Sequence, residues 1–267
     1  MSAALPIRTV EKVWGRETLP PPFEAPAGKR IGEIWFEPPA QLDELLVKYL
    51  FTSEKLSVQV HPDDAQAQAL GDGERGKEEC WLVIDAEPGA TLGIGFDREL
   101  SADEMRAAAR NGSIEGLMTW HEVEAGDFFY IPAGTVHAIG PGVSLIEVQQ
   151  NCDITYRLYD YGRPRELHLE SGMEVAKGEP YGTAHRRKVP PQGEEWLVDG
   201  PHFRLLRSEG KPAGAAAFGN APLLVIPLDA EVTVNGETVA PGGCVLAPGL
   251  SAVGFAPAGL ALLAQPC

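Results

Sequence analysis

The sequence lacks paired cysteines and long hydrophobic runs. Its four cysteines, at positions 80, 152, 244 and 267, form no Cys-x-x-Cys pair, so neither a zinc knuckle nor a disulfide framework is indicated. No run approaches the roughly 20 apolar residues that a membrane-spanning helix needs, and residues 1–8 have no signal-peptide apolar core. We therefore expect a reduced, cytoplasmic protein with no membrane partner.

Basic residues are also scarce. There are 22 Lys and Arg against 38 Asp and Glu, which gives a formal net charge of -16. Most of such a surface repels nucleic acid and anionic membranes, so neither is expected as a partner. The expected partners are small molecules or further copies of the chain.

Glycine and proline, by contrast, are abundant. The 30 Gly and 23 Pro fit a chain with many short strands and turns. Asp63-Asp64 followed by Gly71 predicts one short helix, and the capping box from Ser101 to Glu104 predicts a second, Ala-rich one. We predict a mostly β protein with a helical insertion near residues 101–119. Strands are expected at about 32–37, 45–51, 56–62, 79–84, 91–96, 128–132 and 143–150.

A weak internal sequence repeat bears on the number of domains. Residues 126–134 resemble residues 242–250, but no histidine follows the second copy. We therefore expect a first domain over residues 1–176, a linker rich in Gly, Pro and charge over 177–194, and a smaller, degenerate β-sandwich over 195–267. The alternative is that the last segment is a divergent hairpin of the first domain.

Half of a metal site is visible in one strand. Apolar and polar residues alternate over 56–62, so Gln59 and His61 project from the same face. The remaining ligands should come from other strands, and the spacing Gly126-x-x-x-x-Ile-Pro-Ala-Gly-x-x-His137 is typical of cupins, where it delivers a histidine into a barrel. A lone strand histidine is more often a hydrogen-bonded core residue. The hypothesis of a metal site therefore rests on the combination of these motifs and not on any one of them.

The carboxylate ligand should come from the segment Lys77-Glu78-Glu79. Strand alternation places Lys77, Glu79 and Trp81 on one face and Glu78 and Cys80 on the other, so we expect Glu78 to face solvent. Two histidines, one carboxylate and one amide suit Zn²⁺ and are tolerated by Mn²⁺ or Fe²⁺.

These motifs occur in the order found in the type I mannose-6-phosphate isomerases (phosphomannose isomerases) of the short bacterial form. The chain resembles that family of the cupin superfamily from about Trp14 to Asp160. The resemblance implies a cupin-type jelly-roll barrel and one Zn²⁺, or another divalent ion, per chain. The ligands it implies are Gln59, His61, Glu79 and His137.

The same resemblance implies the remaining site residues. Arg157 matches an active-site arginine, for which the alternative is a surface ion pair, and Glu147 matches a position suited to proton handling during ring opening. Lys48 and Lys77 match lysines close to the metal, where either could act as acid or base or screen negative charge.

A dianionic phosphate needs a positive patch on so acidic a chain. We expect Arg157, Arg163 and Lys48 to bind it. Arg165 lies in the same basic stretch, and we interpret Arg186-Arg187-Lys188 as a solvated loop.

Two departures from the family pattern stand out. Longer members have a histidine directly before the motif lysine, where this chain has Gly76, so no ring-opening role can be transferred to that position. Longer members also carry a large helical domain for which this chain has no room.

The resemblance implies an aldose-ketose isomerase that interconverts mannose 6-phosphate and fructose 6-phosphate through a metal-stabilised enediolate. The alternative is a non-catalytic, metal-containing cupin that binds a sugar or sugar phosphate. A third candidate, a metal oxygenase, fits the Lys-x-Glu and Tyr-x-Leu-Tyr-Asp segments less well.

Overall fold

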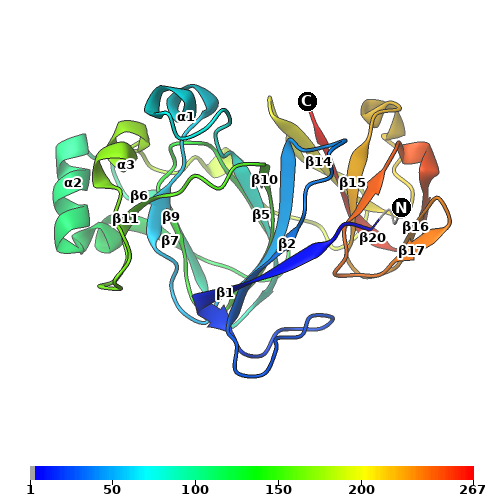
Figure 1. The fold of residues 1–267 in the computed structure, drawn as a ribbon, viewed down its shortest axis with the longest axis horizontal. Coiled ribbons are helices and arrows are strands. Elements are labelled where there is room, and N and C mark those ends of the chain that lie inside the picture. The colour runs from blue at the N-terminus through cyan, green and yellow to red at the C-terminus, as the bar shows by residue number, and fades with distance from the viewer. Residues whose placement is uncertain (1–3) are drawn as a thin grey trace.

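The chain forms two β units that lie side by side. The computed structural model describes residues 4–267, and Figure 1 shows the first unit, which carries the helices, beside the smaller second unit. Strands predominate in both, so the mostly β class with a helical insertion is confirmed.

Two antiparallel sheets build the first unit and face each other as the walls of a barrel (Figure 1). The seven-stranded sheet has the order β1 (Ile7–Arg16), β2 (Ile31–Phe36), β3 (Leu45–Phe51), β10 (Val143–Gln150), β5 (Glu79–Ala86), β8 (Asp127–Ile131), β12 (Arg186–Lys188). The five-stranded sheet has the order β11 (Tyr156–Tyr159), β4 (Val58–Val60), β9 (His137–Ile139), β6 (Thr91–Phe96), β7 (Met118–Glu122).

Side-chain alternation divides the first sheet into an inner and an outer face. Leu50, Trp81 and Leu145 point inward and pack against Leu92 and Ile94 of the facing sheet. The barrel interior is therefore apolar at one end, and the polar side chains of the same strands line the other.

The outside of the five-stranded sheet is covered by α2 (Ala102–Asn111), η1 (Ser113–Leu117) and α3 (Leu169–Val175), whereas α1 (Asp64–Leu70) lies at the upper end of the barrel in Figure 1. Both predicted helices are present; the capping box expected at Ser101 is confirmed, and α1 also begins with a capping box, at Asp63. Gly71 ends α1 with φ 76°, a conformation that favours glycine. Met105 and Ile114 pack the insertion against Val58 and Phe96.

The second unit is a small sandwich with its own core. Its five-stranded sheet has the order β13 (Glu195–Asp199), β14 (Phe203–Glu209), β20 (Leu260–Pro266), β15 (Leu223–Pro227), β18 (Val245–Ala247). Its three-stranded sheet has the order β17 (Glu237–Val239), β16 (Val232–Val234), β19 (Val253–Phe255). Short 3-10 turns are η2 (Thr183–His185), η3 (Ala215–Phe218) and η4 (Leu250–Ala252).

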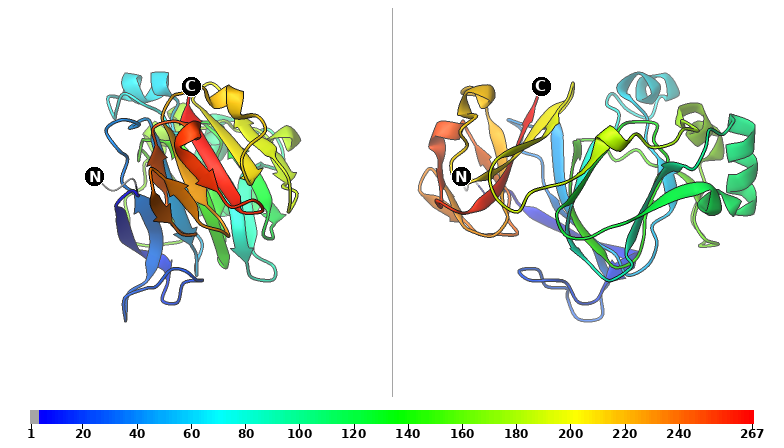
Figure 2. Two further views of the ribbon diagram at one scale, coloured as in Figure 1. Left: turned by 90° about the vertical axis from the view of Figure 1, so that its right-hand side faces the viewer. Right: turned by 180° about the vertical axis from the view of Figure 1, so that it is seen from behind.

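A shared apolar core joins the two units. Tyr49 and Phe51, on the outer face of the first sheet, belong to one buried cluster with Leu205, Leu224 and Leu262 of the second unit. Figure 2 shows the second unit against this outer face, away from the five-stranded sheet. The second unit therefore supports the sheet from behind and does not close over the barrel.

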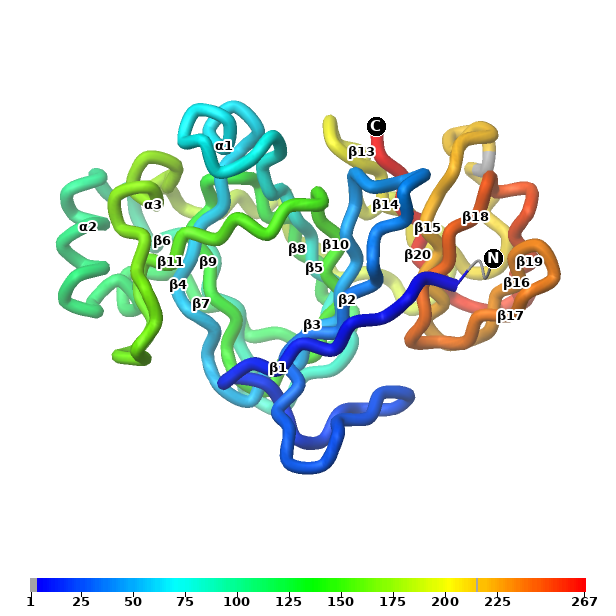
Figure 3. Tube along the Cα trace, viewed as in Figure 1, coloured from blue at the N-terminus to red at the C-terminus, as the bar shows by residue number. Residues whose placement is uncertain are grey.

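Two connections strengthen this junction. β12 lies inside the segment expected to be a linker, yet it pairs with β8 and extends the first sheet. Residues 17–30, between β1 and β2, leave the sheet as a long loop (Figure 3), and Pro22 and Phe23 of this loop come close to Gly242.

Among residues 4–267, no helix combines the length and the apolar composition needed to cross a bilayer.

Candidate metal centre and reaction cavity

Three strands bring the four predicted metal ligands together. Gln59 lies in β4 directly opposite His137 of β9, and His61 follows β4 by one residue. Glu79 begins β5 in the facing sheet. The ligands therefore come from both walls of the barrel, which is why no single segment contains the whole site.

The cluster is compact and buried. His137 Nε2 lies 3.3 Å from Glu79 Oε1, and His61 Nε2 lies 3.7 Å from the same oxygen. One ligand atom from each of these residues falls within 4.8 Å of the others. Gln59 Nε2 is 3.2 Å from His137 Nε2, so the Gln59 amide lies next to the cluster. The edge-on ring of Trp81 packs against His137.

Backbone carbonyls set the tautomer of both histidines. His61 Nδ1 lies 2.8 Å from the Ile154 carbonyl, and His137 Nδ1 lies 2.9 Å from the Thr135 carbonyl. Because a carbonyl only accepts, each Nδ1 carries the proton and donates it. Both Nε2 lone pairs then point to the cluster, as in a metal-binding histidine held by an outer hydrogen bond.

Burial keeps both imidazoles neutral. It lowers the pKa of His137 to about 4, with Lys77 acting in the same direction, and it holds the pKa of His61 well below its ordinary value. Neutral imidazole is the form that binds a metal ion. These two side chains are therefore already in their ligating state at neutral pH.

Glu79 supplies a test of whether a metal fits. Its two carboxylate oxygens are buried, and no donor among the described residues meets either with hydrogen-bond geometry. The nearest cation, Lys77, forms an ion pair with Nζ 2.8 Å from Oε2. Burial raises the pKa of Glu79 to about 7, against the opposing effect of Lys77. A buried carboxylate with unfilled acceptor positions beside two imidazole lone pairs fits a divalent cation.

A second buried network lies beside the cluster. Lys48 Nζ is 3.0 Å from Glu147 Oε1 and also donates to Gln149 Oε1, while Trp81 Nε1 donates to Glu147 Oε2 at 3.0 Å. Burial acts to raise the pKa of Glu147, but Lys48, Lys77 and these hydrogen bonds outweigh it and lower the pKa to about 2. Glu147 therefore stays ionised at neutral pH.

Lys77 connects the cluster with this network. Its Nζ lies 3.2 Å from His61 Nε2 and 4.0 Å from Glu147 Oε1. Burial acts to lower the pKa of Lys77, but Glu79 and Glu147 together raise it above its ordinary value. The ammonium therefore stays protonated at neutral pH and is held between two carboxylates.

A cavity of about 290 Å³ opens onto these groups. Gln59 and Lys77 line it and also contact the cluster, while Lys48, Glu147 and Arg157 line its walls. The other lining residues are Lys12, Trp14, Glu33, Trp35, Leu50, Leu56, Ser57, Ile139, Asp153, Thr155 and Arg165.

Sequence reasoning missed the contribution of β1 and β2. Glu33 accepts from Trp35 Nε1 at 3.0 Å and pairs with Lys12 at 3.1 Å, and the Trp35 ring lies 4.4 Å from Lys48 Nζ. A charged residue inside the strand Ile31–Phe36, two positions from a tryptophan, is the signal that would have found them.

The arginines differ in their placement. Arg157 lines the cavity, donates to the Glu166 carbonyl at 2.7 Å and has no carboxylate within 4.0 Å among residues 4–267, so the alternative of an ion pair is not realised. Its Nε is buried without a partner. Burial and the neighbouring Arg165 lower the pKa of Arg157. This guanidinium is available to an anion.

The structure does not bring Arg163 to this cavity. Its guanidinium bonds Asp160 at 3.1 Å, Glu54 at 3.2 Å and the Lys55 carbonyl at 2.9 Å. Arg165, two residues later, lines the cavity while it pairs with both carboxylate oxygens of Asp160.

Steric crowding explains why position 76 is a glycine. A Cβ at this position would lie 2.4 Å from the carbonyl carbon of Asp63 and 2.5 Å from the Pro62 oxygen. The backbone here is held by hydrogen bonds from Gly76 to Asp64 and from Lys77 to Pro62. The position therefore has no room for any side chain, a histidine included.

Curated relatives were found by sequence comparison. The chain is 45% identical over 209 residues to mannose-6-phosphate isomerase ManA of Bacillus subtilis and 36% identical over 208 residues to the probable mannose-6-phosphate isomerase GmuF of the same organism. These alignments cover 74% and 72% of this chain and 65% of each relative. A mannose-6-phosphate isomerase of Streptococcus mutans is 44% identical over 172 residues, with 54% of its length covered. The chain thus spans less than two thirds of each relative. No protein-family model matches it.

Solved structures share the whole fold. The mannose 6-phosphate isomerase of Bacillus subtilis superposes with a TM-score of 0.80 at 24% identity, covering 98% of both chains. A mannosephosphate isomerase structure from Archaeoglobus fulgidus gives 0.76 at 18% identity, covering 99% of this chain and 98% of that one. A zinc-bound mannose 6-phosphate isomerase gives 0.71 at 14% identity, covering 98% of both.

Proposed function

We propose that this chain, which is similar in sequence to mannose-6-phosphate isomerases, interconverts mannose 6-phosphate and fructose 6-phosphate. The observation that carries the proposal is the joint burial of His61, Glu79 and His137 at the end of a cavity that Lys48 and Glu147 also reach. A metal cluster and a separate acid-base network are what such an isomerisation requires.

We propose that Gln59, His61, Glu79 and His137 hold one Zn²⁺ or another divalent ion. The neutral imidazoles and the unfilled oxygens of Glu79 support this set, and one structural neighbour is described as zinc-bound. When bound, the cation would polarise the carbonyl and hydroxyl oxygens at C1 and C2 and offset the negative charge of the enediolate.

Proton transfer falls to Lys48, Lys77 and Glu147. The reaction moves one hydrogen between C1 and C2, so a base must take it and return it, and an acid must serve the ring oxygen during opening. Glu147 is the ionised carboxylate of this set, and Lys77 is the ammonium nearest to the cluster. Trp81 and Lys48 hold the Glu147 carboxylate by one hydrogen bond to each oxygen, which fixes its orientation.

The phosphate would bind at the arginine side of the cavity. Arg157 has an unpartnered Nε and no neutralising carboxylate, and Arg165 and Lys12 line the same space. A guanidinium can bind two phosphate oxygens at once. Lys48 remains a second candidate for screening negative charge, whereas the partners of Arg163 favour a role in holding the loop.

A chelation experiment tests this proposal. Protein treated with a chelator should lose conversion of mannose 6-phosphate to fructose 6-phosphate and regain it with added Zn²⁺, measured with a coupled enzyme that consumes fructose 6-phosphate. Full turnover without metal would remove the metal from the proposal. Tight sugar-phosphate binding without conversion would favour the non-catalytic cupin.

The four cysteines, free throughout the described residues, support the expected cytoplasmic location.

A further inference from the structure

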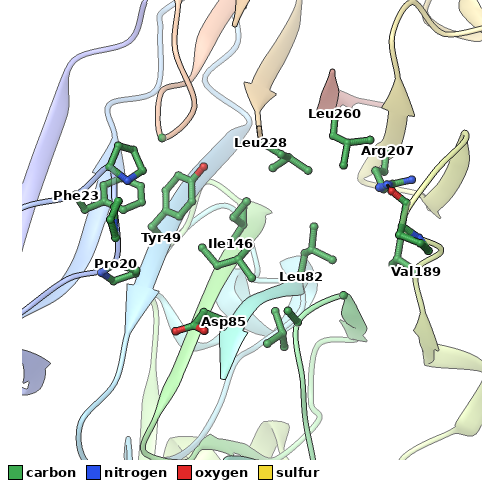
Figure 4. A pocket seen from close by; sticks show the side chains of 18 of the residues that line it. Pro20, Phe23, Tyr49, Leu82, Asp85, Ile146, Val189, Arg207, Leu228 and Leu260 are labelled. Atoms are coloured by element: carbon green, nitrogen blue, oxygen red, sulfur yellow. Dashed lines mark hydrogen bonds between the residues drawn. The ribbon is translucent and has the colours of Figure 1, made fainter. Parts of the chain in front are cut away.

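A second, larger cavity lies behind the sheet that carries Lys48 and Glu147. Its volume is about 620 Å³, and it is enclosed by the outer face of the first sheet, the loop of residues 17–30 and the second β unit. Figure 4 shows Tyr49, Ile146 and Leu82 side by side as the wall formed by the sheet. Cavities of this size between structural units commonly hold small molecules.

Tyr49 carries an unused polar group into this cavity. The residue is only 3% exposed, and its hydroxyl has no hydrogen-bond partner among residues 4–267. Its ring is held by Phe23, with the ring centroids 4.6 Å apart, and by stacking on Phe51. The hydroxyl is not fully buried in protein; it borders the cavity, where it can bond a polar atom supplied by a ligand.

Arg207 lines the opposite side (Figure 4) and is a buried cation with no direct ion pair among the described residues, while Glu209, Glu195 and Asp229 act on its charge from farther away. It is 4% exposed, and its guanidinium donates only to the carbonyls of Pro191 and Gly193, which uses two of its five N–H groups. No carboxylate of the described chain lies within 4.0 Å of it. Such a group favours an anionic partner.

The remaining lining is mostly apolar, with Leu82, Ile146, Leu228 and Leu260 between the two polar groups. Asp85 and Lys188 also line the cavity, and Lys188 is paired with Glu124 and Asp127. We propose that this cavity is a second ligand site for a small aromatic carboxylate that carries a hydroxyl at its far end. The carboxylate pairs with Arg207, the ring lies on Leu82 and Ile146, and the hydroxyl bonds Tyr49.

The two cavities share one layer of backbone. Ile146 lies opposite both Tyr49 and Leu82 in the sheet, and Glu147 lies opposite both Lys48 and Trp81. A ligand in the second cavity therefore touches side chains that are each one residue away from a member of the Lys48–Glu147–Trp81 network.

Three matched probes test the site by isothermal titration calorimetry: 6-hydroxy-2-naphthoate, 2-naphthoate without the hydroxyl, and 2-naphthol without the carboxylate. The hydroxynaphthoate should bind once per chain, roughly fivefold more tightly than either partial probe, since each polar contact is worth about 1 kcal/mol. Absence of saturable binding, or equal affinity for the three probes, would overturn the proposal.

Two variants locate the bound probe. Tyr49→Phe should weaken the hydroxynaphthoate to the affinity of 2-naphthoate and leave 2-naphthoate unchanged. Leu228→Trp, on the second unit, fills the space and should weaken all three probes, with circular dichroism confirming that the fold is retained. Unchanged binding of the hydroxynaphthoate by either folded variant would place the probe elsewhere and overturn the assignment.

A competition experiment separates this site from the reaction cavity. Saturating mannose 6-phosphate should leave the affinity for the hydroxynaphthoate within a few-fold, whereas complete displacement would place the probe in the reaction cavity and contradict the proposal. None of these measurements requires turnover, so their outcome is independent of whether the chain is an isomerase.

Discussion

Glu147 and Lys48 face each other across β10 and β3 with Oε1 3.0 Å from Nζ, and both side chains are only 5% exposed. Burying an ion pair of this kind costs free energy. Removing only one of its two charges costs more, because the other charge is then buried without a partner. Its position at the wall of the reaction cavity supports the proposed role of the pair in proton transfer.

Glu147→Gln should lower the free energy of unfolding at pH 7 by about 3 kcal/mol, because Lys48 would lose its carboxylate inside the protein. It should also flatten the acid limb of the stability curve. The pKa of Glu147 is lowered to about 2, so its ionised form stabilises the fold above its unfolded pKa, and this stabilisation is lost as the pH falls towards 2.

The measurement is urea unfolding between pH 3 and 7 in the presence of a chelator. Glu24→Gln, at an exposed position, should keep the wild-type dependence on pH. An equally steep acid limb in Glu147→Gln would show that other carboxyl groups dominate it.

His137→Ala should abolish stoichiometric metal binding and leave the fold intact. The substitution removes one of two imidazole nitrogens from the cluster. Metal content by atomic emission after dialysis, together with the thermal unfolding of the chelated protein, checks both parts. His185→Ala, which lies outside the cluster, is the matched control and should retain one ion per chain. A His137→Ala protein that still binds one ion would exclude this residue as a ligand.

Arg157→Lys should raise the KM for mannose 6-phosphate about thirtyfold, since a lysine cannot bind two phosphate oxygens in the fixed geometry of a guanidinium. Arg163→Lys should leave KM nearly unchanged, because that guanidinium is occupied by Asp160 and Glu54. Steady-state kinetics at fixed ionic strength compares the two. A larger KM effect from Arg163→Lys would indicate that the phosphate binds beside Arg163 and not beside Arg157.

Gly76→Ala should destabilise the protein by about 2 kcal/mol, because its methyl group would overlap the backbone of Pro62 and Asp63. Gly116→Ala is the control, since a Cβ there meets nothing within 4 Å, and its effect should stay within about 0.5 kcal/mol. Chemical unfolding measures both, and equal stability of the two variants would contradict the steric explanation.

The metal-ligand candidates could be found from the sequence because each lies in a short motif with its own signal. Strand alternation placed Gln59 with His61, and it also separated Glu79 from Cys80, which the structure buries in different apolar surroundings. Glu78 is half-buried because its carboxylate accepts a hydrogen bond from Tyr130, a long-range contact that alternation cannot reveal.

Other features depend on pairings between distant strands. Trp35 reaches Lys48 only because β2 lies next to β3, and local sequence does not specify that neighbour. Arg163 and Arg165 have similar surroundings in the sequence. The turn between them and β11, with Tyr161 at φ 54° and Gly162 at φ 77°, gives them different directions in space.

The apolar face between the two units also affects how the chain is made. β20 lies between β14 and β15 in the second unit, and it comes later in the chain than both. During synthesis, Phe23 of the first unit can already pack against Tyr49 and Phe51, but the part of this face that the second unit covers stays exposed until that unit has been made. The first unit is therefore vulnerable to aggregation in that interval, and chaperones that bind exposed apolar strands should matter most before the second unit has folded.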